Sequence, residues 1–263
     1  MSVTVVFGPL AYRMEGVTEA ELPPVLVGYV ARAGRVEAAP VPISFTPAPL
    51  WNDALEGPQT GNGFRLESAP EGDRVRVLPY SPRWPGRGLL AALGELVCRD
   101  APRVGAVAVH AAAVRGPRSL ALLLAPPGTG KTTLARAAGE ASFAHNAVLA
   151  GPGGAWALPF AGDPDPSLDA PGQVPVGLLV ELLRADDPTG PGGIFEWGPR
   201  GGATTLVMRA CARPRGADPF APQRAMIALE LLASLPGARL RVSRPEGAWQ
   251  VLRSVLASWE SVL

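Results

Sequence analysis

The sequence contains little of what marks secreted, membrane-spanning or nucleic-acid-binding proteins. The sequence of 263 residues has two cysteines, Cys98 and Cys211. Two cysteines are too few for a disulfide framework, and these two do not have the spacing of metal ligands. No run of about 18 apolar residues is present to span a bilayer. The net charge is +1 and no basic run is found, so neither nucleic acid nor a membrane surface is an expected partner. The first ten residues lack the features of a signal peptide, which favours a cytoplasmic protein.

Lysine is nearly absent. Among the 24 lysines and arginines, Lys131 is the one lysine. The accompanying bias towards Ala, Gly, Pro and Arg is typical of a GC-rich coding sequence in which arginine has replaced lysine. Because an ammonium is compact whereas a guanidinium is a wide planar fork, the retained lysine indicates a site that needs a small cation, such as a nest of amides around a phosphate. Chance survival of one lysine is the alternative.

Two regions are predicted, with a boundary marked by the prolines and glycines between residues 79 and 88. Residues 1–87 form an irregular β-rich region, in which apolar or β-branched runs at 3–7, 25–30 and 74–78 are separated by turns. Residues 88–263 form an α/β domain. Its expected elements are helices at 89–99, 132–139, 222–235 and 247–263, strands at 104–114, 120–124, 147–149, 155–158 and 204–209, and an apolar run at 176–183.

The most specific motif follows the expected strand at 120–124. It matches the G-x-x-x-x-G-K-[ST] phosphate-binding loop, except that Ala125 replaces the first glycine. Gly128 and Gly130 allow backbone conformations in which successive N–H groups point inward, and the following helix contributes its positive end. Lys131 is expected to reach the β- and γ-phosphates of a nucleoside triphosphate, and the Thr132 hydroxyl to bind Mg²⁺. A glycine turn without a ligand is the alternative. The predicted nucleotide-binding residues are Pro127, Gly128, Thr129, Gly130, Lys131, Thr132 and Thr133.

The loop alone does not choose among the families that carry it. Its amino-acid sequence resembles the loop of AAA+ ATPases. That family also has an apolar run that ends in Asp-Glu, and the run that ends at Glu181 lacks the Asp. GTPases need an Asn-Lys-x-Asp motif, and the sequence has no second lysine to form one. The Leu-Ser-Gly-Gly-Gln-type signature of ABC ATPases is absent as well. An AAA+-type or other ATPase therefore stays an alternative.

Another resemblance extends over residues 88–263. His110 lies in the apolar stretch 109–114 before the loop, residues 143–149 follow the loop helix, and residues 158–163 read Leu-Pro-Phe-Ala-Gly-Asp. These segments resemble the strand before the loop, the segment with paired acids and the Pro-Phe-x-Gly-acid turn of HPr kinase/phosphorylase-like proteins, a family that includes small bacterial peptide-modifying kinases. The resemblance implies an α/β fold with a P-loop nucleotide-binding core of the HPr-kinase type and an N-terminal β-rich region.

The same resemblance implies an ATP- and Mg²⁺-dependent kinase that phosphorylates a serine of a protein or peptide. In the family, paired acids hold the metal and accept the hydroxyl proton, and here His145 and Asn146 take their positions. His145 and His110 are therefore candidate catalytic bases, with Asp163 as a candidate substitute carboxylate. Asn146 and Thr132 are the candidate metal ligands. The alternatives are two buried structural histidines and a solvated loop around Asp163.

The absence of the acid pair supports a second hypothesis, a catalytically weakened nucleotide-binding regulator or scaffold. Mg²⁺ prefers hard oxygen ligands, so an imidazole is a poor substitute for a carboxylate. A kinase acts on a protein or peptide acceptor, whereas a regulator binds ATP with little turnover. The sequence does not name the acceptor, and it leaves self-association into a homo-oligomer open.

Overall fold

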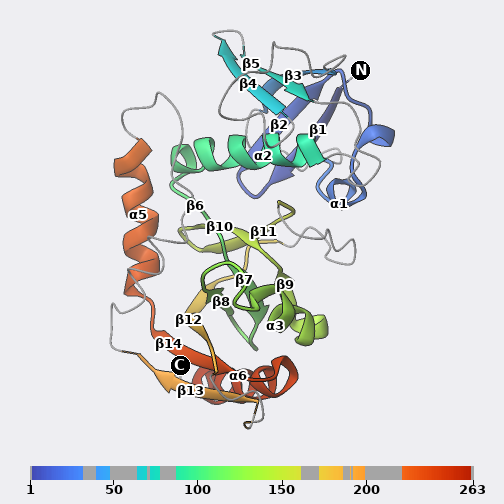
Figure 1. The fold of residues 1–263 in the computed structure, drawn as a ribbon. Helices are drawn as coiled ribbons and strands as arrows, with labels where there is room; N and C mark the ends of the chain where they lie inside the picture. Colours follow the sequence, from blue (N-terminus) through green and yellow to red (C-terminus); the bar gives the residue numbers. More distant parts are fainter. Residues whose placement is uncertain are drawn as a thin grey trace. The chain divides into compact units, whose positions relative to one another are not determined.

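The chain divides into two compact units (Figure 1). The first unit comprises Met1–Asp100 and Pro159–Ala170, and the second comprises Ala101–Leu158 and Pro171–Leu263. The computed structural model describes residues 2–31, 40–47, 64–69, 72–77, 87–160, 172–185, 190, 192–198 and 221–261. Helices accompany β-sheet in both units, so the mixed α/β class is confirmed. Among the described helices, none combines the length and the apolar composition that a membrane crossing needs.

The first unit is built on a five-stranded sheet in the order β1-β2-β3-β5-β4. The pairs β1–β2 and β4–β5 are antiparallel, whereas β3 runs parallel to both β2 and β5. Helix α2 (Arg87–Asp100) packs against β4 and β5. It buries Leu89, Leu93, Leu96 and Val97 on one face, as their spacing predicts. The strands are β1 (Ser2–Phe7), β2 (Leu10–Glu15), β3 (Val41–Pro47), β4 (Phe64–Ala69) and β5 (Gly72–Val77).

A buried polar contact joins the end of α2 to the sheet. Asp100 is 1% exposed, and its carboxylate accepts hydrogen bonds from the Tyr12 hydroxyl at 3.2 Å and from Arg99 at 2.8 Å to each oxygen. Burial, followed by the Asp100 charge, raises the pKa of Tyr12 well above its usual range. The phenol therefore stays a hydrogen-bond donor at every physiological pH.

One expectation for the first region is wrong. Residues 25–30 were expected to form an extended run, but Pro24–Val27 is a short helix, α1, with proline at its first position. Proline suits the first turn of a helix because its missing N–H has no partner there. Of the run, only Val30 joins the sheet, through an isolated bridge to Val5.

The second unit contains a six-stranded sheet in the order β13-β14-β12-β8-β7-β9 and a three-stranded sheet in the order β11-β10-β6. In the larger sheet β8 is parallel to β12 and antiparallel to β7. The strands are β6 (Val107–Val109), β7 (Ala112–Arg115), β8 (Leu120–Leu124), β9 (Ser142–Ala144), β10 (Ala147–Gly151), β11 (Gly154–Leu158), β12 (Val176–Arg184), β13 (Gly193–Trp197) and β14 (Gly237–Val242). The helices are α3 (Lys131–Ala137), α5 (Ala221–Ser234) and α6 (Pro245–Glu260), with 3-10 turns η3 (Ala101–Val104) and η4 (Gly139–Ala141).

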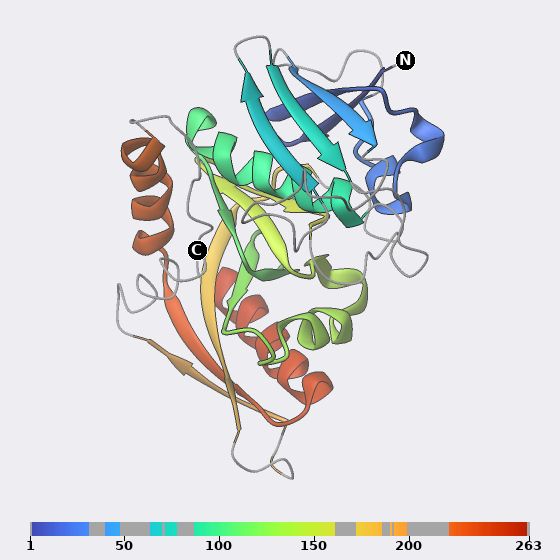
Figure 2. The same ribbon diagram turned by 45° about the horizontal axis from the view of Figure 1, so that its top comes forward.

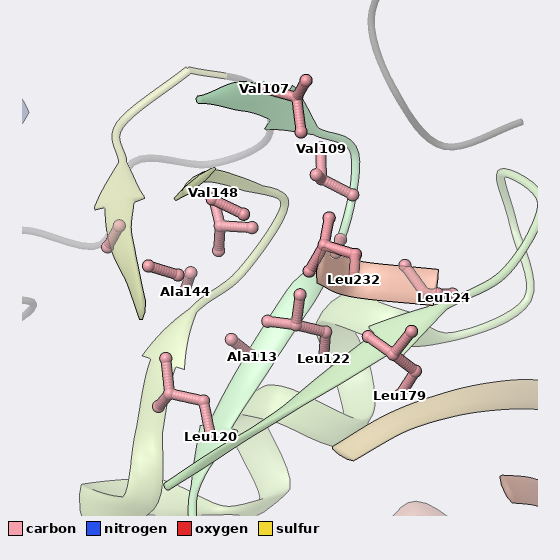
Figure 3. Packing of buried hydrophobic residues seen from close by; sticks show 14 of the residues in the cluster. Val107, Val109, Ala113, Leu120, Leu122, Leu124, Ala144, Val148, Leu179 and Leu232 are labelled. Carbon is pink, nitrogen blue, oxygen red and sulfur yellow. The ribbon is translucent and has the colours of Figure 1, made fainter. Parts of the chain in front are cut away.

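Strand β8 is buried on both faces, and its alternating side chains enter two separate cores. Leu120, Leu122 and Leu124 pack with residues of β6, β10 and α5 in one core, shown in Figure 3. Ala121 and Leu123 enter the other core with residues of α3 and α6. These two helices pack side by side on that face (Figure 2). Continuous burial explains why β8 reads as an unbroken apolar run rather than an alternating one.

The expected strand at 104–114 is wrong as a single strand. The structure divides it into β6 and β7, which belong to different sheets, with His110 and Ala111 between them. Both halves are apolar, so composition does not reveal the break. Strands β8, β10 and β11 and helices α2, α3, α5 and α6 confirm the other expected elements within a few residues at their ends. The strand expected at 204–209 lies outside the described residues.

The end of α6 is tied to the turn between β7 and β8. Glu260 is 3% exposed, and its carboxylate accepts hydrogen bonds from the backbone N–H groups of Arg118 at 2.5 Å and Ser119 at 3.0 Å. The Ser119 hydroxyl also donates to it, at 2.5 Å. Within the turn, the Gly116 N–H donates to the Ser119 carbonyl at 2.7 Å. One carboxylate thus accepts hydrogen bonds from two backbone N–H groups and one hydroxyl of the turn.

We expect Glu260→Ala to lower the free energy of unfolding by about 2–3 kcal/mol, because two backbone donors and one hydroxyl lose a charged acceptor. Glu230→Ala is the matched control, since Glu230 is an exposed residue in the middle of α5 and its loss should change stability by about 0.5 kcal/mol or less. Urea denaturation of both variants measures the difference. Equal effects of the two substitutions would contradict a role for Glu260 in holding the turn.

Candidate functional site

The glycine-rich segment forms an exposed loop between β8 and α3. Gly128 and Gly130 have φ values of 79° and 98°, in the region that favours glycine, and Gly130 caps α3. A Cβ atom added to either glycine would meet nothing within 4 Å. Glycine is therefore required by the backbone conformation, and the space above both residues is open. Pro126 and Pro127 are exposed beside them.

The Lys131 side chain folds back over this loop. It is 5% exposed, and Nζ donates hydrogen bonds to the carbonyl oxygens of Ala125 at 2.7 Å and Pro126 at 3.3 Å. Burial lowers the pKa of Lys131. Lys131 forms no ion pair with the residues that the structure describes. A buried ammonium that is balanced by neutral carbonyl dipoles alone gains free energy when an anion approaches.

The threonines of the segment have different surroundings. The Thr132 hydroxyl donates to the backbone carbonyl of His145 at 3.2 Å, which joins the start of α3 to the segment after β9. The Thr129 hydroxyl donates to the Pro126 carbonyl at 2.9 Å and so closes the loop on itself. Thr133 is exposed. Because a hydroxyl that donates its proton keeps its lone pairs, Thr132 Oγ1 can still act as an acceptor or ligand.

The two histidines lie at neighbouring crossings between the two sheets. His110 connects β6 to β7, and His145 with Asn146 connects β9 to β10. Each crossing leaves one sheet and enters the other. The residues on either side are paired, Val109 with Val148 and Ala113 with Ala144, so the register brings the two crossings together. Tertiary pairing thus places both histidines on the same part of the second unit.

Electrostatics connects His110 to the loop. Burial lowers the pKa of His110, and the positive charge of Lys131 lowers it further. The imidazole is therefore neutral at pH 7 and has a nitrogen free of a proton. His145 is 8% exposed, and its carbonyl contacts Thr132. The structure places the predicted residues Lys131, Thr132, His110 and His145 in one region, and their chemical roles stay predictions.

Carboxylates are scarce around the loop in the part of the chain that the structure describes. Asp163, the predicted substitute carboxylate, lies outside the described residues. Asn146 is half-buried, and its side chain forms no hydrogen bond with the described residues. Glu181 lies beside Leu124 in the pairing of β12 with β8, but its carboxylate accepts a hydrogen bond from Arg239 at 2.9 Å. Within the described ranges, no group of three or more His, Cys, Asp or Glu residues is arranged to hold a metal.

The backbone carbonyl of His145 is a contact that sequence reasoning missed. The sequence points to the imidazole, because only side-chain chemistry can be read from residue type. The structure adds the carbonyl oxygen as the partner of Thr132. No sequence signal identifies this contact, since it depends on how β9 ends next to α3.

We expect Lys131→Met to raise the pKa of His110 towards its ordinary value of about 6.5 without restoring it fully, because the nearby charge is removed while the burial remains. Histidine NMR titration measures this, and since the chain has two histidines, His145→Asn identifies the signals. Arg241→Gln, an exposed change on β14, should leave the pKa unaltered. An unchanged His110 pKa in Lys131→Met would mean that the two groups are electrostatically independent.

The lowered pKa of His110 also makes the stability of the fold depend on pH. The unfolded chain binds a proton more readily at this residue, so the contribution of neutral His110 is complete above about pH 6.5 and is lost as the pH falls through the folded pKa. This loss should be smaller in Lys131→Met, as unfolding measured at several pH values would show.

No protein-family model matches the chain, and no curated protein matches it. What the loop binds is therefore inferred from its own chemistry.

Proposed function

We propose that this protein binds ATP with Mg²⁺ at residues 125–133 and transfers the γ-phosphoryl group to a serine of a protein or peptide. The observation that supports the proposal is the Lys131 ammonium, which is buried over an open glycine loop and, among the described residues, has two carbonyl oxygens and no carboxylate as partners. The kinase activity follows from the resemblance of residues 88–263 to HPr kinase/phosphorylase-like proteins.

In the proposed complex, Lys131 exchanges its two carbonyl acceptors for the β- and γ-phosphate oxygens. The ammonium is the charged donor in both cases, but phosphate oxygens carry the opposite charge that neutral carbonyls lack, so the exchange is favourable. The positive φ angles of Gly128 and Gly130 leave their N–H groups in a loop whose adjacent space is open. Phosphate binding at such a nest needs little rearrangement of the backbone.

The residues around Thr132 fit a magnesium ion that arrives with its nucleotide. Thr132 Oγ1 and the Asn146 amide oxygen are hard oxygen donors, as Mg²⁺ prefers, and both are neutral. The phosphate oxygens and water complete such a site and supply the negative charge. The hydrogen bond from Thr132 to the His145 carbonyl orients the hydroxyl with its lone pairs free. When bound, Mg²⁺ neutralises charge that develops on the phosphates during transfer.

His110 and His145 are the proposed acceptors of the serine proton. A general base must be unprotonated at the working pH, and the lowered pKa keeps His110 in that state at neutrality. The backbone carbonyl of His145 accepts the hydrogen bond from Thr132, so this residue lies next to the start of α3. Transfer through a loose transition state depends mainly on positioning and charge, so a neutral imidazole in place of a carboxylate is compatible with slow phosphoryl transfer.

A second function is supported by a specific observation. The position of the family's acid pair is occupied by His145 and Asn146, and Glu181, which sheet pairing places beside Leu124, is hydrogen-bonded to Arg239. A nucleotide-binding regulator needs the loop and Lys131 but not a base. This alternative predicts ATP binding with little turnover.

We expect Lys131→Met to weaken ATP binding by about 10- to 100-fold, which corresponds to the loss of hydrogen bonds to a charged partner. Lys131→Arg keeps the charge but brings a wide fork into a buried position, so it should weaken binding nearly as much. Arg241→Gln is the control and should bind ATP normally. Isothermal titration calorimetry measures all three. Unchanged affinity in Lys131→Met would show that the nucleotide site is elsewhere.

Phosphoryl transfer separates the kinase from the regulator. With labelled ATP and the proteins encoded beside this one, we expect a labelled acceptor, and no label with Lys131→Met. Replacing the histidine that acts as base by alanine, in His110→Ala or His145→Ala, should lower the transfer rate by roughly 10²–10⁴-fold and leave ATP affinity unchanged. Tight ATP binding without transfer to any of these proteins would support the regulator. Full activity in both histidine variants would exclude the imidazoles as bases.

A further inference from the structure

A pocket of about 510 Å³ lies in the second unit at the end of α3 that is remote from the glycine loop. It is enclosed by three segments: the turn after β7, the residues that follow α3, and one face of α6. The lining side chains used below are Arg115, Glu140, Trp249, Arg253 and Leu256. Its volume is in the range of about 300–1,000 Å³ that is usual for small-molecule sites.

This pocket is separate from the proposed nucleotide site. Helix α3 begins at the glycine loop and ends at the pocket, and its seven residues span about 10 Å. Strand β8 runs between the same two places in the opposite direction, from the turn after β7 to the loop. A ligand in the pocket therefore does not contact a phosphate held by the loop.

The pocket is built by elements that are held in place. Trp249, Arg253 and Leu256 are spaced four and three residues apart, so they share one face of α6. Trp249 and Leu256 are buried, with 7% and 1% exposure, and form an apolar floor, whereas Arg253 is exposed. Arg115 stacks over the Phe143 ring at 4.9 Å, and the turn that follows it is fixed by Glu260.

The charged side chains of the pocket have no charged or hydrogen-bonding side-chain partner in the part of the chain that the structure describes. Arg115, Arg253 and Glu140 form neither an ion pair nor a side-chain hydrogen bond with the described residues. Two guanidinium groups and one carboxylate leave an excess of positive charge at the rim. Guanidinium groups bind phosphate and carboxylate through paired hydrogen bonds, which suits them to one anionic group.

We propose that this pocket binds a small organic anion, with a phosphate or carboxylate group at Arg115 and Arg253 and an apolar, planar body against Trp249 and Leu256. The combination of an apolar floor with a few polar groups at the rim is the usual composition of a small-molecule site. The proposal is independent of the function proposed for the glycine loop, because it uses none of the same residues.

The experiment titrates the full chain with phenyl phosphate and with benzoate by isothermal titration calorimetry. Both carry a planar ring, and they distinguish a phosphate from a carboxylate as the preferred anionic group. We expect at least one of them to bind, and Arg115→Gln and Arg253→Gln each to weaken that binding about tenfold or more. Arg241→Gln, which removes an exposed arginine outside the pocket, is the matched control and should bind normally.

Two further variants separate this site from the loop and from unfolding. Lys131→Met should retain the binding, since the pocket does not include the loop. Glu140→Gln removes the carboxylate of the pocket and should tighten binding roughly threefold, a gain that misfolding does not produce. The proposal is overturned if neither ligand binds, if Lys131→Met abolishes binding, or if the two arginine variants bind as the control does.

Discussion

Lys131 carries a buried charge that forms no ion pair with any described residue, and the arrangement of the second unit makes this possible. The side chain is 5% exposed, and two carbonyl oxygens of the loop are its acceptors. Those carbonyls are held because β8, which precedes them, is buried on both faces of its sheet. A rigid strand thus supports a loop whose backbone is strained enough to need glycine at two positions. The cost of burying the ammonium is offset when an anion binds, which is why the loop is the strongest candidate site.

The crossings at His110 and at His145 extend this site beyond the loop. Both occur where the chain passes from one sheet to the other, and the paired residues on either side keep them adjacent. A crossing leaves backbone carbonyls outside the ladder, and one of them, on His145, becomes the acceptor for Thr132. The change of sheet therefore supplies both the imidazoles and a backbone contact to the start of α3.

The glycine loop and the pocket lined by Arg115 and Arg253 lie at opposite ends of the same two elements, β8 and α3. Each location follows from the chain direction: the loop follows the carboxyl end of β8, and the pocket forms where α3 ends beside the turn that precedes β8. The turn is held by Glu260 from α6, and α6 also supplies one wall of the pocket. One helix thus stabilises the turn and shapes the pocket beside it.

Several local elements carry patterns strong enough to be predicted from the sequence. The sequence predicts the apolar run of β8, the apolar spacing of α2 and α6, and the glycine loop with its lysine. Each of these features depends on residues close together in the chain. The break at His110 depends on tertiary pairing, because both halves of 104–114 are apolar and it is the pairing of β6 with β10 and of β7 with β9 that separates them. Tertiary structure also sets the contact of Thr132 with a backbone carbonyl, and it brings Arg115 and Arg253, which are far apart in the chain, to the lining of one pocket. Such contacts are chosen by sheet register and helix packing, which no short stretch of sequence specifies.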